Sequence, residues 1–96
     1  MVDLTDWTID EGIQTHEDQV LYLKAALAEA GDDAAYIGQV LGNIVRVRGI
    51  ETVAKNIGMD PVSLKNALSG EVVPDFGIVL KVVKALGLEW HVSEAA

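Results

Sequence analysis

The 96-residue sequence contains no cysteine, only two prolines and only 5% aromatic residues. The lack of cysteine excludes disulfides, thiolate metal sites and cysteine nucleophiles. No apolar run reaches the roughly 18 residues that a membrane span needs, and the acidic N-terminus lacks the basic and then apolar order of a signal peptide. A chain of this length has room for one domain. We therefore expect a single soluble, cytoplasmic domain that has no membrane partner.

Basic residues are also few, and they are unevenly distributed. Seven Lys and Arg face 15 Asp and Glu, which gives a formal net charge of -8. Residues 1–36 hold nine acids and a single base, Lys24, whereas six bases balance six acids in the remainder. This asymmetry indicates two interaction surfaces of different polarity, although an acidic solvated face explains it equally well. The total charge by itself argues against nucleic-acid binding.

Capping residues and apolar periodicity predict five helices after about residue 15, preceded by an acidic segment, residues 1–15. A side chain that can accept a hydrogen bond precedes most segments of helical apolar periodicity, as is typical of helix starts. A glycine follows most of these segments, as is typical of helix ends. The predicted helices run from Thr15 to Gly31, from Asp32 or Asp33 to Gly49, over Glu51–Ile57, from Asp60 to Gly70, and from Asp75 to Leu86. These helices belong to one domain, residues 16–96.

Two features of the last third of the chain indicate a partner. The helix expected over residues 75–86 is apolar well beyond one face, which is unusual for a surface helix. Residues 88–92 alternate apolar and polar side chains, which predicts a short C-terminal strand. A single strand cannot satisfy its own backbone groups, so it must pair with a second copy of the chain or with Trp7–Ile9. We predict a homodimer whose interface includes Ile78, Val82 and Trp90.

The segment from Ile50 to Ser69 has the spacing of a helix-turn-helix motif. Ala54 supplies the small residue where the two helices cross, and Gly58, four positions later, tolerates the positive φ of a tight turn. The positions that would bury the contact between the helices are apolar: Val53, Ile57, Met59, Leu64 and Ala67. The same pattern also occurs in helical bundles that never touch DNA, so both interpretations stand at this point.

Further stretches make the resemblance specific, and they cover nearly three quarters of the chain. They are Tyr22–Leu27, Ile44–Gly49, Val53–Gly58, Ser63–Gly70 and Val79–Leu88. In these stretches the sequence resembles the addiction-module antidote protein family, which includes HigA-like antitoxins with a phage-repressor-type helix-turn-helix. The resemblance implies an all-α, five-helix repressor-like domain, here with the short C-terminal strand. It also implies a dimeric antitoxin that neutralises a basic RelE/HigB-like ribonuclease toxin and represses its own operon.

The resemblance places the DNA-reading residues at the start and on the outward face of the helix at residues 61–69. The reading surface would fall on Pro61, Val62, Lys65 and Asn66, where Lys65 could reach either a guanine or a phosphate. Phosphate contacts, which position the protein without reading sequence, would fall on Lys55, Ser63 and Ser69. A solvated helix face is the alternative interpretation of Lys65 and Asn66. Glu51 and Asp60 carry negative charge near the expected phosphates, which favours a weak, salt-sensitive or toxin-assisted repressor.

Little in the chain indicates catalysis. His16 and His91 stand without metal-ligand spacing, and helix capping explains Asp32 and Asp33 better than acid–base chemistry. There is no nucleophile elbow and no glycine-rich phosphate loop. We therefore expect no enzyme, no metal and no cofactor; the partners are double-stranded operator DNA, the toxin and a second copy. Two other functions stay open, a stand-alone prophage-type regulator and a protein-interaction module with vestigial DNA binding.

Overall fold

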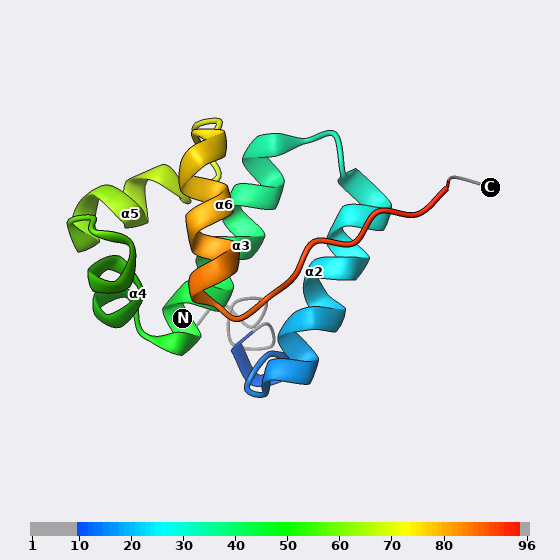
Figure 1. Ribbon diagram of the computed structural model, residues 1–96, viewed down its shortest axis with the longest axis horizontal. Helices are drawn as coiled ribbons and strands as arrows, with labels where there is room; N and C mark the ends of the chain where they lie inside the picture. The colour runs from blue at the N-terminus through cyan, green and yellow to red at the C-terminus, as the bar shows by residue number, and fades with distance from the viewer. Residues whose placement is uncertain (1–9, 95–96) are drawn as a thin grey trace, which may run out of the picture.

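Helices make up most of the chain in the computed structural model, which describes residues 10–94 (Figure 1). They are α2 (His16–Ala30), α3 (Ala34–Arg48), α4 (Ile50–Ile57), α5 (Pro61–Ala67) and α6 (Phe76–Ala85). Residues 10–12 are helical as well. Within residues 10–94 there is no strand, and no helix there is long and apolar enough to cross a membrane. The described part of the chain is therefore all-α.

Four of the helices begin at a side-chain oxygen that accepts a hydrogen bond from a backbone N–H of the first turn. The Thr15 hydroxyl accepts one from the Asp18 N–H over 3.1 Å, the Asp33 carboxylate from the Tyr36 N–H over 3.1 Å and the Asp75 carboxylate from the Ile78 N–H over 3.3 Å. Asp60 does the same for α5. These bonds satisfy amides that have no partner inside the helix. The predicted helix starts are confirmed, and of the two candidates for α3 the cap is Asp33 rather than Asp32.

Helix α3 lies at the centre of the molecule. It packs against α2 on one side and against α4 and α6 on the other, and α4 also contacts α5 and α6 (Figure 1). The side chains that fill this core are almost entirely aliphatic. The largest apolar ones that are fully buried are Leu41, Ile44, Leu64, Leu86, Val40, Val45 and Val82. Burial of such side chains stabilises a fold by about 1.5–3 kcal/mol each, so this core holds α5 on α3 and α4.

A polar junction ties α2 to the rest of the domain. Gln19 on α2 is only 1% exposed, and its amide donates to the Ile13 carbonyl over 2.9 Å. The Arg48 guanidinium donates to the Gln19 side-chain oxygen over 2.8 Å and to the Leu86 carbonyl over 3.0 Å. Ile13 itself is 3% exposed and belongs to the core. Residues 10–15 of the acidic N-terminal segment therefore pack onto the domain; residues 1–9 lie outside the described part of the chain.

The predicted strand at residues 88–92 is wrong for the single chain. Residues 88–94 are extended but irregular, and they run across α2 (Figure 1). The alternation reflects a single covered position, because Leu88 packs on the core while Trp90 is 48% exposed and Val92 is 99% exposed. No other extended segment of residues 10–94 lies ready to pair with this backbone, which is therefore left to water. The other candidate partner, Trp7–Ile9, lies outside the described residues.

Helix α6 is apolar on more than one face, as the sequence predicts, and the structure shows which face is covered. Val82, Val83 and Leu86 are buried in the core. Phe76 and Leu80, one turn apart on another side, are 70% and 41% exposed. Val82, predicted at a dimer interface, is 0% exposed and supports α6 from inside the chain. Of the three predicted interface residues, Ile78, which is half-buried, and the exposed Trp90 retain surface for a second copy.

Candidate nucleic-acid interface

Helices α4 and α5 form a helix-turn-helix. Helix α4 ends at Gly58, which takes the left-handed conformation with φ 72° and ψ 32°. This conformation costs a glycine little and most other residues considerably more. The Met59 N–H then donates to the Ala54 carbonyl over 2.9 Å, which closes the turn. Ala54 is 0% exposed, so a small side chain lies where the sequence pattern requires one.

The start and the inner side of α5 are held firmly. The Asp60 carboxylate accepts from the backbone N–H groups of Val62 and Ser63 over 3.0 and 3.2 Å, and Pro61 occupies the first turn. On the inner side Leu64 is 0% exposed and Leu68 is 4% exposed. The outer side of α5 therefore has a defined orientation. The Asp60 charge lies at the positive end of the helix dipole, where a negative charge is favourable.

The residues predicted to contact DNA all lie on α4, on α5 or in the turn that follows α5. Six of them are exposed and one, Pro61, is half-buried; the exposed ones are Lys55, Val62, Ser63, Lys65, Asn66 and Ser69. Val62 is an apolar side chain and is 64% exposed. The Ser69 hydroxyl accepts from the Glu71 N–H over 3.2 Å, so it is partly engaged in a local turn. Glu51 is exposed in the first turn of α4.

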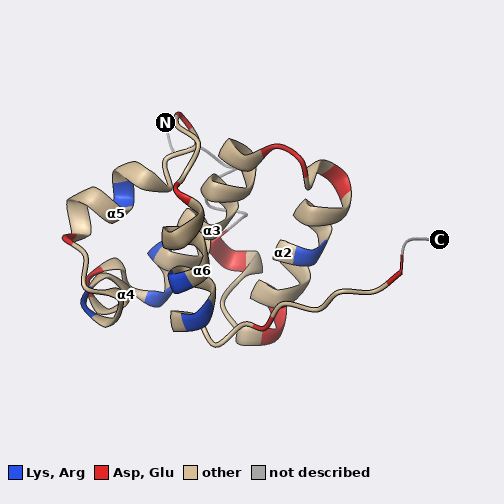
Figure 2. Ribbon diagram, turned by 45° about the horizontal axis from the view of Figure 1, so that its top comes forward, with Lys and Arg blue, Asp and Glu red and all other residues tan. Residues whose placement is uncertain are grey.

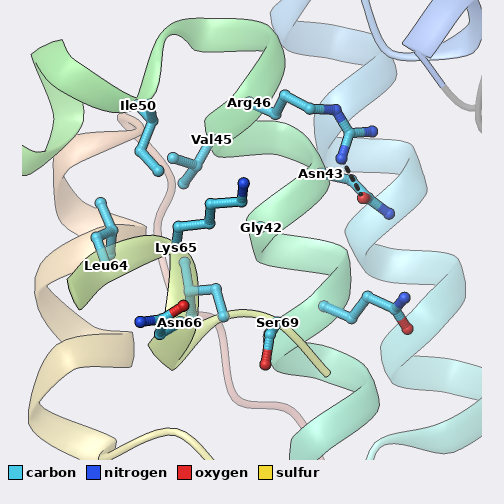
Figure 3. Close-up of a pocket in the computed structure, with 11 residues that line it drawn as sticks. Gly42, Asn43, Val45, Arg46, Ile50, Leu64, Lys65, Asn66 and Ser69 are labelled. Atoms are coloured by element: carbon cyan, nitrogen blue, oxygen red, sulfur yellow. Dashed lines mark hydrogen bonds between the residues drawn. The ribbon is translucent and has the colours of Figure 1, made fainter. Parts of the chain in front are cut away.

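A hollow of about 460 Å³ separates α5 from α3. It is lined by Gln39, Gly42, Asn43, Val45, Arg46, Ile50, Leu64, Lys65, Asn66, Leu68 and Ser69. Figure 3 shows the Lys65 side chain pointing across the hollow toward α3, whereas Asn66 points away to the other side of α5. The structure thus brings three of the predicted residues, Lys65, Asn66 and Ser69, to the edges of one hollow. Their neighbours in sequence, Val62 and Ser63, lie at the start of α5.

The α3 side of this hollow carries functional candidates that the sequence analysis did not identify. Arg46 forms an ion pair with Asp10, and its guanidinium also donates to the Asn43 side-chain oxygen over 3.1 Å. The Asn43 amide in turn donates to the Tyr22 hydroxyl over 3.0 Å. In the sequence, Arg46 is a base in the last turn of a helix, where it is typical of the favourable end of the helix dipole. Its position beside α5 depends on how α3 packs.

Charge is segregated between the two halves of the molecule. All the bases except Lys24 lie on α3, α4, α5 and α6, whereas acids dominate α2 and the turns at its two ends (Figure 2). The bases on the α3–α6 side are Arg46, Arg48, Lys55, Lys65, Lys81 and Lys84. The uneven charge distribution of the sequence therefore becomes an acidic side and a second side, which carries the helix-turn-helix and most of the bases. On this second side the bases are largely balanced by acids such as Glu51, Asp60, Glu71 and Asp75.

A second hollow, of about 410 Å³, lies between α2 and the C-terminal tail. Apolar residues line much of it, and His16 and His91 both lie at its edges. Within residues 10–94, however, no three His, Asp or Glu side chains are grouped so that they could hold a metal ion.

Residues 3–94 match the family described as "Probable addiction module antidote protein". The chain belongs to this family. The resemblance stated from the sequence is thus confirmed, and membership implies a cognate toxin as partner of this antidote. A relative from Haemophilus influenzae, which carries the name "Uncharacterized protein", is 36% identical over 92 residues, or 96% of the antidote and 93% of the relative. No solved structure matches the antidote. Proteins of this family are generally not enzymes.

Proposed function

We propose that this antidote is a homodimeric antitoxin of a type II toxin–antitoxin module. It neutralises a basic RelE/HigB-like ribonuclease toxin, and it represses its own operon by binding operator DNA through α5. The observation that carries the DNA-binding part is the exposed outer side of α5, held in one orientation by the buried Leu64 and Leu68. A recognition helix must present its side chains rigidly to the major groove, and this packing meets that requirement.

The outer side of α5 has the chemistry needed to read base edges. Asn66 can bond the N6 and N7 atoms of one adenine, and the exposed Val62 can touch a thymine methyl group. Lys65, Lys55, Ser63 and Ser69 supply donors for phosphates, which fix the position of the protein on the duplex. Pro61 sets the start of the helix and its approach to the groove. The surface thus combines one strong candidate for base recognition with several positioning contacts.

The acidic side of the molecule supports toxin binding. Glu17, Glu29 and Asp32 are exposed on or beside α2, where Lys24 is the base. A ribonuclease that holds RNA must be basic, so these carboxylates would steer the toxin to this side and away from the helix-turn-helix. Trp7 and Ile9, which we expect to add apolar anchors, lie outside the described residues.

The DNA-binding part is tested by titrating the purified antidote against two fluorescent duplexes of equal length. One carries the promoter region of its own operon and the other a scrambled sequence. We expect tighter binding of the promoter duplex, with an affinity that falls steeply as salt rises, because phosphate contacts release counterions. Equal affinity for both duplexes would mean that α5 does not read sequence.

Two observations favour the interaction-module alternative as the second candidate function. The net charge is -8, and the exposed Glu51 lies in the first turn of α4, where it would repel a phosphate. In that case the exposed Val62 and the adjacent apolar side chains would serve a protein partner instead. The same titration separates the two functions, because an interaction module would bind neither duplex. A stand-alone regulator would bind its promoter but have no gene for a small basic ribonuclease beside its own.

A further inference from the structure

The hollow between α3 and α5 has two cationic side chains, one from each helix. Lys65 points into it from α5, and Arg46 lines it from α3 with its guanidinium turned toward Asn43 (Figure 3). The uncharged polar side chains at its edges, among them Gln39 and Ser69, can donate hydrogen bonds. We propose that Arg46 and Lys65 together hold one phosphate of the DNA backbone in this hollow, and that Asp10 competes with that phosphate for Arg46. This inference rests on the proposed DNA binding.

Arg46 is held in place by contacts that a phosphate would not disturb. Its Nη1 donates to the Asn43 side-chain oxygen, and the Asn43 amide is anchored on the Tyr22 hydroxyl of α2. A guanidinium has five N–H donors in a planar fork, so donors are left for a second acceptor. An arginine that is already oriented loses less side-chain entropy when it binds. Arg46 therefore has the properties of a preorganised phosphate ligand.

Asp10 occupies the other end of the same guanidinium. The ion pair joins Arg46 Nη2 to an Asp10 carboxylate oxygen, and the two side chains are 51% and 41% exposed. A pair that is this open to water is screened and contributes little to stability, so a phosphate can displace the carboxylate at low cost. Because Asp10 belongs to the acidic N-terminal segment, the pair also joins this segment to the DNA side of the domain. Asp10 thus lowers DNA affinity without changing the base contacts.

The test is a double-mutant cycle on DNA binding, carried out with the full-length chain. Four proteins are compared, namely the parent, Asp10→Asn, Arg46→Gln and the double variant, each titrated with promoter and scrambled duplexes over a range of KCl concentrations. We expect Asp10→Asn to bind both duplexes several-fold more tightly, with little change in the slope of log affinity against log salt, because the same phosphate contact forms in both proteins. Arg46→Gln should bind both duplexes more weakly by an equal factor, and the slope should flatten by about 0.9 because that contact is lost.

The effect of Asp10→Asn must disappear in the Arg46→Gln background, because Asp10 is proposed to act only through Arg46. Two matched controls separate the effect of the Asp10–Arg46 contact from the effect of a changed net charge. Glu11→Gln removes a neighbouring exposed acid that makes no ion pair within residues 10–94, and Lys24→Gln removes a base on the far side of the molecule. Circular dichroism of each variant checks that the helices are intact.

The outcomes separate this inference from the proposed function. If the parent prefers its promoter but Asp10→Asn binds no more tightly than Glu11→Gln, the competition is refuted while DNA reading stands. If the gain from Asp10→Asn persists without Arg46, the effect is one of general charge and the inference is equally refuted. If the parent does not distinguish promoter from scrambled duplex, and Arg46→Gln changes neither affinity, both the proposed function and the inference fail.

Discussion

At the scale of single residues, Asn66 and Lys65 have different environments although they are neighbours in sequence. Lys65 points across the hollow toward α3, and Asn66 points to the other side of α5 (Figure 3). This difference favours a positioning role for Lys65 and a base-reading role for Asn66. Substitutions at the two positions should therefore produce different losses.

We predict that Asn66→Ala weakens binding to the promoter duplex by about 1–3 kcal/mol, because a bidentate base contact is lost. Binding to a scrambled duplex should hardly change. Lys65→Ala should weaken binding to both duplexes equally and reduce the slope of log affinity against log salt by about one unit. Fluorescence anisotropy at several salt concentrations measures both effects. Equal behaviour of the two variants would contradict this division of roles.

Gly42 on α3 marks a close approach between α3 and the end of α5. A Cβ atom at this position would lie 2.6 Å from the Leu68 carbonyl oxygen, which is backbone and cannot rotate away. We predict that Gly42→Ala lowers the free energy of unfolding by about 1–3 kcal/mol, as overpacking typically does. Urea unfolding measures the change. Gly12→Ala is the matched control, because no atom lies within 4 Å of the added Cβ; a similar loss there would refute the packing argument.

At the scale of secondary-structure elements, α2, α3 and the end of α6 are connected by Arg48. Its guanidinium donates to the buried Gln19 side chain and to the Leu86 carbonyl. The helices also share apolar contacts, but these are not directional. The Arg48 bonds therefore add directional contacts between α2, which carries many of the acids, and the half of the molecule that carries α4 and α5.

We predict that Arg48→Met lowers the free energy of unfolding by about 1–3 kcal/mol, because the buried Gln19 oxygen loses its donor. Arg46→Met removes the same charge but breaks only exposed contacts, the ion pair with Asp10 and the hydrogen bond to Asn43, so it should lower the free energy of unfolding by less than about 1 kcal/mol. Urea unfolding of both variants, followed by far-UV circular dichroism, makes the comparison. Equal costs would show that the Gln19–Arg48 junction adds nothing to stability.

At the scale of the whole molecule, apolar surface remains that the single chain does not cover. Phe76 on α6 is largely exposed, and Leu80 on α6 and Trp90 in the tail are each exposed over more than two fifths of their surface. The acids of α2 would repel a second copy, so the α6 side is the better candidate for self-association. A palindromic operator also requires two copies related by a two-fold axis.

We predict that the protein is a dimer at micromolar concentration, with twice the single-chain mass of 10.3 kDa by light scattering. Trp90→Ala and Ile78→Ala should shift the equilibrium toward monomer, because both remove apolar surface from the predicted interface. Leu21→Ala, which removes a 57% exposed side chain from α2, is the control and should leave the mass unchanged. A monomeric parent protein would contradict the prediction.

The segregation of charge predicts how the toxin finds the antidote. We predict that Glu17→Gln combined with Glu29→Gln lowers the association rate with the basic ribonuclease, most strongly at low salt where screening is weakest. Glu51→Gln combined with Glu71→Gln changes the net charge equally but on the other side, so it should have a smaller effect. Stopped-flow fluorescence or surface plasmon resonance measures the rates. Equal rates for the two double variants would rule out steering by α2.

Local sequence determined most of the secondary structure of this protein. The caps at Thr15, Asp33, Asp60 and Asp75 and the left-handed turn at Gly58 each depend on groups within a few residues, so the sequence contains the whole interaction. The helix-turn-helix and the exposure of α5 followed from the same local signals. Membership of the antidote family could likewise be stated from matched stretches alone.

Only the tertiary structure decided the contacts between residues far apart in the chain. Arg46 meets Asp10 across 36 positions, and Arg48 meets Leu86 across 38, because the packing of α3 at the centre brings these segments together. For the same reason the sequence could not tell that α6 buries Val82 and exposes Phe76, since both are apolar and only the neighbouring helices select the inner face. The predicted strand at residues 88–92 was wrong for the same reason. Alternation of apolar and polar residues is a property of one segment, whereas a β-strand needs a second extended segment beside it to bond its backbone groups.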